Sequence, residues 1–174
     1  MDTQTQASEQ VPMLATPQEE HQWLQQLVGE WTNEARMTMS SEPAETCLGS
    51  ESVRSLGGLW ILAEGRGEMP GGGSATMVMT LGYDPAKKRY VGTWVGSMMT
   101  HLWLYDGELD ASGTVLTLNS QGPDMSPGAA PGKLARYRDV IEIKGADYRT
   151  LTSFCQGEDG NWQQFMTAHY RRTK

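Results

Sequence analysis

Thr76-Met-Val-Met-Thr-Leu-Gly-Tyr83 is the first of three short segments that decide the fold class of this chain. The next two are Tyr90-Val-Gly-Thr-Trp-Val-Gly-Ser-Met98 and His101-Leu-Trp-Leu-Tyr105. All three are rich in β-branched and aromatic residues and too short for a typical helix, so they predict consecutive antiparallel strands. Asp84-Pro85 and Asp106-Gly107 supply turn residues after the first and third segments. Both strand faces carry apolar side chains, which favours a closed or strongly curled sheet, and the pattern leaves open which face of the second and third segments is interior.

The rest of the chain extends this pattern to roughly ten strands. Residues 1–15 are polar and Gln-rich and are predicted to form a disordered arm, while residues 16–174 form a single domain. Thr16-Pro17-Gln18-Glu19 is typical of a helix start, with Thr16 as N-cap, and Gly29 ends that short helix. Gly and Pro in residues 122–132 predict the longest internal loop. The other predicted strands cover residues 30–40, 46–56, 59–69, 114–118, 134–144, 148–156 and 162–172. Short turns between them predict an all-β, up-and-down antiparallel barrel.

Composition excludes several classes of partner. The formal net charge of −7, with only short basic clusters, argues against nucleic acid. No apolar run reaches membrane-spanning length, and the N-terminus lacks the pattern of a signal peptide, so we expect a cytoplasmic protein that does not bind membranes. Cys47 and Cys155 are far apart in the sequence and are expected to be reduced structural thiols.

Several short sequence segments along the chain resemble those of a known family. They include Glu51-Ser-Val-Arg-Ser-Leu-Gly-Gly-Leu-Trp60, Gly67-Glu-Met-Pro-Gly-Gly-Gly73, Tyr105-Asp-Gly-Glu-Leu-Asp110 and Met166-Thr-Ala-His-Tyr-Arg171. Together they resemble the bacterial domain-of-unknown-function family 1579 over roughly residues 17–173. The resemblance implies a calycin-like barrel, related in architecture to lipocalins and to the haem-binding nitrobindins. It implies no established activity and no catalytic residues.

A barrel of this size can enclose one small ligand, so apolar and aromatic inward positions become candidates for the wall of a binding cavity. The candidates are Trp31, Trp60, Met77, Met79, Trp94 and Trp103. They predict binding of a small apolar or amphipathic molecule.

Polar residues on apolar strand faces are the second set of candidates. Asp139 shares its face with Tyr137 and Ile141, so it is predicted to point inward, where an unpaired carboxylate would be costly. Arg54 is a candidate counter-ion for Asp139, and a purely structural ion pair or hydrogen-bonded network is the alternative role for this carboxyl. Glu64 is a candidate for a pocket mouth or for a solvated pair at the rim, and Asn33 is a candidate for the wall.

His101 alternates with aromatic residues and is either a wall residue or, in a narrower hypothesis, an axial haem ligand. No cofactor other than this haem alternative is suggested, and no pair of histidines has metal-ligand spacing. Two other functional classes stay open. One is an enzyme that uses an interior carboxylate. The other is a structural or dimerisation module whose barrel is filled by its own side chains and which could form a homodimer.

Overall fold

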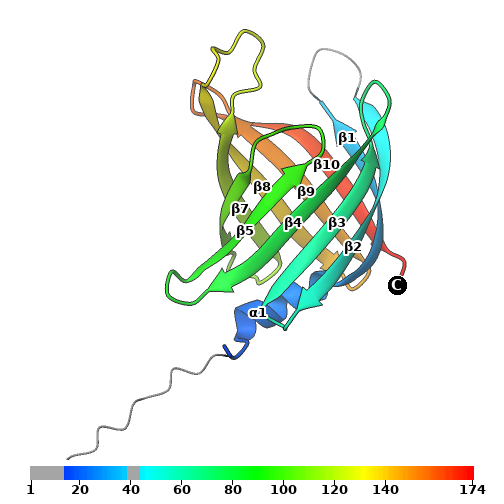
Figure 1. Cartoon of the computed structure of the whole chain (residues 1–174), viewed down its shortest axis with the longest axis vertical. Coiled ribbons are helices and arrows are strands. Elements are labelled where there is room, and N and C mark those ends of the chain that lie inside the picture. The colour runs from blue at the N-terminus through cyan, green and yellow to red at the C-terminus, as the bar shows by residue number, and fades with distance from the viewer. Residues whose placement is uncertain (1–13, 39–43) are drawn as a thin grey trace, which may run out of the picture.

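The chain folds into a closed barrel of ten antiparallel strands (Figure 1). This description rests on a computed structural model and covers residues 14–38 and 44–174. Two helical turns, α1 (Glu19–Leu24) and the 3-10 segment η1 (Gln25–Leu27), precede the first strand. The strands are β1 (Gly29–Met37), β2 (Glu45–Leu56), β3 (Trp60–Glu68), β4 (Ser74–Asp84), β5 (Arg89–Gly96), β6 (Trp103–Leu109), β7 (Val115–Pro123), β8 (Leu134–Gly145), β9 (Tyr148–Gln156) and β10 (Trp162–Arg172). The predicted fold class is confirmed.

Each strand pairs with its neighbours in the chain, and β1 closes the barrel against β10. The closing ladder runs from the pair Trp31 and Arg172 to the pair Met37 and Met166. Closure satisfies the backbone groups of both terminal strands, so the sheet has no free edge. Because side chains alternate across a strand, one set of positions on every strand points into the barrel.

The helical segment packs against one end of the barrel and closes it (Figure 1). Leu24 and Leu27 are fully buried there, and the indole nitrogen of Trp23 donates to the Gly113 carbonyl at 2.7 Å. The helix begins later than predicted, because Gln18 is the N-cap and its capping partner is the His21 side chain. Thr16 therefore does not cap the helix.

The turns explain where the strands end. Gly57 and Gly58 both have positive φ in the β2–β3 turn, a conformation that glycine adopts without strain. Several predicted boundaries were wrong. β5 ends at Gly96 rather than at Met98, and β6 begins at Trp103 rather than at His101. Two strands also end later than predicted: β6 continues through Asp106 and Gly107 to Leu109, and β7 continues to Pro123. These residues pair with the neighbouring strand, and ladder hydrogen bonds override their turn propensity. The predicted disordered arm and the predicted end of the first strand at Ser40 lie mostly outside the described residues.

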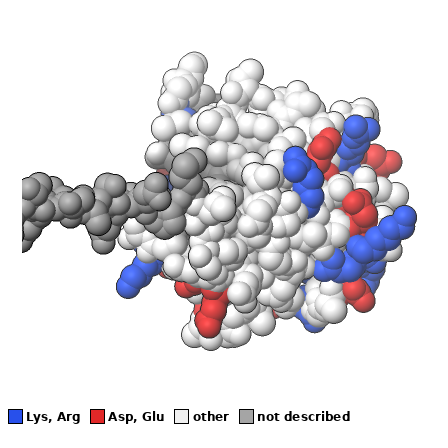
Figure 2. Space-filling view, turned by 60° about the horizontal axis from the view of Figure 1, so that its bottom comes forward, with Lys and Arg blue, Asp and Glu red and all other residues white. Residues whose placement is uncertain are grey.

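The outer surface mixes charges of both signs. In Figure 2, which tilts the helix end forward, Lys and Arg side chains lie next to Asp and Glu side chains, and uncharged residues cover most of this face. Arg89, for example, contacts Asp106 at 2.7 Å and Glu108 at 2.8 Å on the outside of the barrel. Within residues 14–38 and 44–174, no helix has the length and apolarity to cross a membrane. Cys47 and Cys155 are both free thiols.

Candidate functional site

The barrel encloses a cavity of about 740 Å³. Its lining includes Met37, Met69, Met77, Met79, Met98, Met99, Met125 and Met166, which are all eight methionines of the described residues. Methionine side chains are unbranched and polarizable, so they adapt to apolar molecules of different shape. The interior is hollow, and the alternative of a barrel filled by its own tryptophans and methionines is wrong.

Small side chains at inward positions create this space. On β3 the inward residues are Ala63, Gly65 and Gly67, while the residues between them, Glu64 and Arg66, are exposed. A strand of this kind occupies little of the interior and leaves room that the long methionine side chains of β4 only partly fill.

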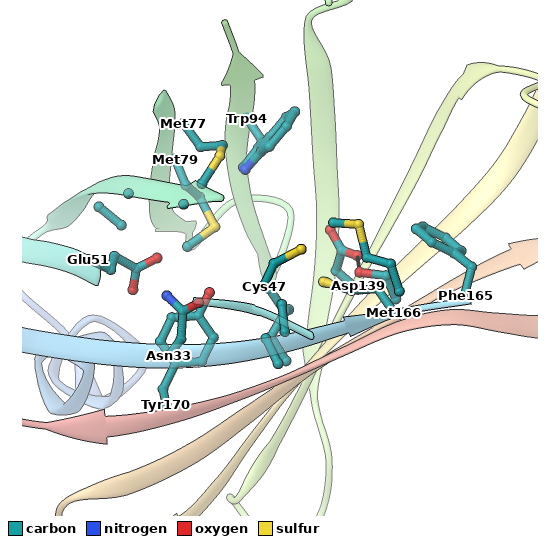
Figure 3. A pocket seen from close by; sticks show the side chains of 18 of the residues that line it. Asn33, Cys47, Glu51, Met77, Met79, Trp94, Asp139, Phe165, Met166 and Tyr170 are labelled. Carbon is teal, nitrogen blue, oxygen red and sulfur yellow. Dashed lines mark hydrogen bonds between the residues drawn. The ribbon is translucent and has the colours of Figure 1, made fainter. Parts of the chain in front are cut away.

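One wall of the cavity is apolar, and the opposite wall, called the polar wall here, carries most of the polar groups among apolar side chains such as Met37 and Met166. Met77, Met79 and Trp94 come from β4 and β5 and lie on one side, whereas Asn33 and Tyr170 come from β1 and β10 and lie across from them (Figure 3). The polar wall continues through Glu51, Tyr105, Ser120, Asp139, Arg149 and Ser153. A site divided in this way matches an amphipathic molecule, with its chain on the methionine side and its polar group on the other.

Asp139 is the central polar group of the cavity. It points inward as predicted, from the middle of β8, and its two carboxylate oxygens accept hydrogen bonds from the hydroxyls of Tyr105 and Ser153, each at 2.5 Å. Burial raises the pKa of the Asp139 carboxyl, while these two hydrogen bonds act in the opposite direction. Burial and the neighbouring Asp139 also raise the pKa of Tyr105 well above its ordinary value.

Arg149 and Glu51 form the one ion pair that lies inside the barrel in the described part of the chain. The Arg149 side chain is only 2% exposed, and its guanidinium carbon lies 3.9 Å from the centre of the Tyr170 ring and 4.7 Å from that of Trp31. Stacking between two rings fixes the guanidinium and directs it at Glu51. Burial is the main cause of the raised pKa of Tyr170, and Glu51 adds to it.

Aromatic side chains surround the other end of the cavity, away from the helix. The Trp103 and Tyr137 rings meet edge to face at 4.8 Å, and the Tyr137 hydroxyl donates to the Pro123 carbonyl at 2.5 Å. The indole nitrogen of Trp103 lies 3.1 Å from the Met99 sulfur. This end is formed by loops rather than by a helix (Figure 1).

Six of the eleven residues proposed from the sequence line the cavity: Asn33, Met77, Met79, Trp94, Trp103 and Asp139. Trp31 also points inward, but it belongs to the packed closed end, where its indole nitrogen donates to the Leu27 carbonyl at 2.9 Å. The structure thus resolves the face of β5 and β6 that was left open: Trp94 and Trp103 are interior.

The other four proposed residues do not reach the cavity. Arg54 and Glu64 are exposed on the outer face, so Arg54 is not the counter-ion of Asp139. Trp60 is 38% exposed and covers Gly82 from outside, because the inward positions of β3 are the alternate ones. His101 lies before β6, and its Nε2 is 3.1 Å from the Gln121 carbonyl oxygen.

The sequence analysis missed the most informative polar residues, Glu51, Arg149 and Ser153. A signal for two of them existed. Arg149 and Ser153 share the alternation of Leu151 along β9, which is an inward-facing set. The partner of Arg149 comes from β2, far away in the sequence, and no local pattern indicates that pairing.

The described residues hold no group of three or more His, Cys, Asp and Glu side chains arranged for a metal ion. All three histidines are described, and none of them lines the cavity. His101 therefore lies outside the lining of the cavity, and its role as an axial haem ligand stays a prediction.

The comparison with protein families decides the relationship of this chain. Residues 16–172 match the family described as protein of unknown function (DUF1579). The chain belongs to this family. The match covers the helix and all ten strands, in agreement with the resemblance seen in the sequence. No curated protein matches the chain.

Solved structures show the same fold at low sequence identity. Rv2717c from M. tuberculosis is 12% identical, with a TM-score of 0.63, covering 91% of this chain and 100% of that one. The S-type phycobiliprotein lyase CPES from Guillardia theta is 14% identical, with a TM-score of 0.54, covering 91% of this chain and 99% of that one. At these identities the likeness shows a shared barrel fold.

Proposed function

We propose that this DUF1579 protein binds a small apolar or amphipathic molecule inside its barrel. The observation that carries the proposal is the cavity of about 740 Å³, whose lining combines eight methionines with a few polar groups. Cavities of roughly 300–1,000 Å³ with mostly apolar walls are typical of small-molecule sites. The fold shared with a phycobiliprotein lyase is compatible with this function.

The energetic basis is burial of apolar surface. Each methylene group that moves from water into the methionine-lined side contributes roughly 0.8 kcal/mol. A ligand also has to order itself in the barrel, so measurable affinity requires a chain or ring system that contacts much of the wall. The polar wall orients the ligand, because an unpaired polar group facing it would be unfavourable.

Tryptophan fluorescence offers a direct test, because Trp94 and Trp103 both line the cavity. Titration with an uncharged apolar probe such as N-phenyl-1-naphthylamine, and with medium-chain alcohols, is expected to change this fluorescence saturably and to raise the melting temperature. Absence of both effects with every probe would contradict the proposal.

A cavity-filling variant provides the matched control. Ala63→Phe places a large ring at an inward position of β3, whereas Ser52→Phe places the same ring on the outer face of β2. The first is expected to weaken probe binding at least tenfold by occupying the ligand's space, and the second is expected to leave binding unchanged. Equal effects of the two variants would locate the probe outside the barrel.

A further inference from the structure

The charged groups that line the cavity are strongly unbalanced. They comprise four acidic residues and a single basic one: Glu45, Glu51, Glu68, Asp139 and Arg149. Charge alone does not make a site, but these groups border an apolar cavity large enough for a ligand. The imbalance therefore bears on which ligand head group the cavity accepts.

The basic groups are not free to receive an anion. Arg149 already contacts Glu51 and is held between two aromatic rings, and its Nε is buried, with no hydrogen-bond partner among the described residues. In the β7–β8 loop, Lys133 lies 3.1 Å from Asp124 and 2.5 Å from Glu158. A ligand carboxylate would have to displace an existing partner at either place.

The acidic groups, in contrast, have capacity left. Asp139 accepts two hydroxyl hydrogen bonds but has no ion-pair partner in the described part of the chain. Farther from the helix end, Glu68 accepts from the Leu48 amide at 2.9 Å and Glu45 from the Gly71 amide at 3.2 Å, each through one oxygen only. A carboxylate has about four acceptor positions, so each of these groups can still bind a donor.

We propose that the cavity selects amphiphiles with a cationic, hydrogen-bond-donating head group, of the alkylammonium class, and discriminates against carboxylates of equal chain length. This inference rests on the proposed binding function. The ammonium group would meet Asp139 and give that buried carboxylate the counter-charge it lacks, while the chain lies against Met77 and Met79. A carboxylate head would meet acidic groups along the same path, at an electrostatic cost.

Three ligands that differ only in the head group test this inference on the unmodified protein. Decylamine, decanol and decanoic acid are titrated near neutral pH, below their aggregation concentrations, by tryptophan fluorescence and calorimetry. We expect the amine to bind at least tenfold more tightly than the acid, with the alcohol between them. Equal or tighter binding of the acid would overturn the inference while leaving the proposed function intact. Failure of all three to bind would defeat the proposed function itself.

Two variants then assign the effect to Asp139. Asp139→Asn removes the charge and keeps a side chain of the same size, so the amine is expected to lose about tenfold in affinity while the alcohol changes little. Glu64→Gln removes a charge from the outer face of β3 and is expected to change no affinity. Equal weakening of all three ligands in Asp139→Asn would show a merely structural role. If Asp139→Asn does not fold, Glu68→Gln serves as the second variant. It is expected to reduce the ratio of amine affinity to acid affinity, and an unchanged ratio would count against the inference.

Discussion

Arg149 and Glu51 show how one ion pair organises the interior of the barrel. A buried charge is costly unless it is paired, and here the pair is supported by the rings of Tyr170 and Trp31. Trp31 is therefore important for the site even though it does not touch the cavity. It holds the arginine that keeps Glu51 neutralised.

Removing both partners of this pair is expected to be less harmful than the two single substitutions added together. Arg149→Met leaves Glu51, whose side chain is only 12% exposed, without a counter-charge and should lower the free energy of unfolding by about 3 kcal/mol. The double variant Arg149→Met, Glu51→Leu should be more stable than the sum of the single effects predicts, by about 2 kcal/mol, because no charge is left unpaired. Urea unfolding followed by tryptophan fluorescence measures the free energy of unfolding of the parent protein, the two single variants and the double variant.

The exposed contact between Arg89 and Glu108 serves as the control for that comparison. Arg89→Met is expected to change stability by less than about 1 kcal/mol, because solvent screens an outer ion pair. Additive effects of the Arg149 and Glu51 substitutions would mean that the two side chains do not stabilise each other.

At the scale of the strands, glycines decide where the sheet can curl. A Cβ atom built on Gly92 in β5 would lie 1.9 Å from the Thr80 carbonyl oxygen, which is backbone and cannot move aside without distorting β4. Gly92→Ala is therefore expected to destabilise the protein by about 3 kcal/mol. The measurement is the free energy of unfolding in urea.

Gly65→Ala provides a matched comparison on β3. There the added Cβ would meet the terminal methyl of Met77 at 3.3 Å, and that flexible side chain borders the cavity and can yield. We expect a change of less than about 1 kcal/mol. Similar losses for Gly92→Ala and Gly65→Ala would show that backbone proximity is not what Gly92 relieves.

Strand number and antiparallel order could be predicted from the sequence because turn residues recur between short β-forming segments. The Gly57-Gly58 turn, for example, lies where it was predicted. The face of β3 was harder to predict. Trp60 was predicted to line the cavity, but a hollow barrel places the smaller residues of this strand, Ala63 and Gly65, inside. Alternation alone gives two sets of residues and does not say which of them surrounds a cavity.

The candidate site could be predicted only in part for the same reason. Asp139 and the methionines of β4 followed from alternation along a single strand. The contacts that define the polar wall join strands distant in sequence, as Glu51 of β2 joins Arg149 of β9. Such pairings depend on barrel closure, which local sequence patterns do not encode.

The molecule as a whole is a container with one packed end and one end formed by loops (Figure 1). The helix and a core that includes Leu24, Ile61 and Leu81 fill the packed end, and each of these side chains is 0% exposed. The remaining inward positions line the cavity. This division places the packed core at the helix end and the cavity in the rest of the barrel.

Tyrosine ionisation reports on the integrity of this interior. Burial raises the pKa of Tyr90 above its ordinary value and that of Tyr137 to about 12. In the unfolded chain tyrosine ionises near pH 10, so above that pH the unfolded state binds fewer protons than the folded state. Stability must therefore fall as the pH rises from about 10 toward 12.

Tyr90→Phe isolates one contribution to this fall. The Tyr90 hydroxyl is buried and has no hydrogen-bond partner among the described residues, so its removal should leave stability at neutral pH unchanged or slightly higher. Above about pH 10 the free energy of unfolding of the variant should rise relative to that of the parent protein by up to roughly 1.4 kcal/mol per pH unit, because the phenylalanine ring cannot ionise on unfolding.

Tyr137→Phe should instead lower the free energy of unfolding by about 1 kcal/mol at neutral pH, since the Tyr137 hydroxyl donates to the Pro123 carbonyl. Urea unfolding of the parent protein and the two variants between about pH 8 and pH 11.5 measures both effects. If the difference in the free energy of unfolding between Tyr90→Phe and the parent stayed constant across this range, burial would not be what keeps the Tyr90 hydroxyl protonated.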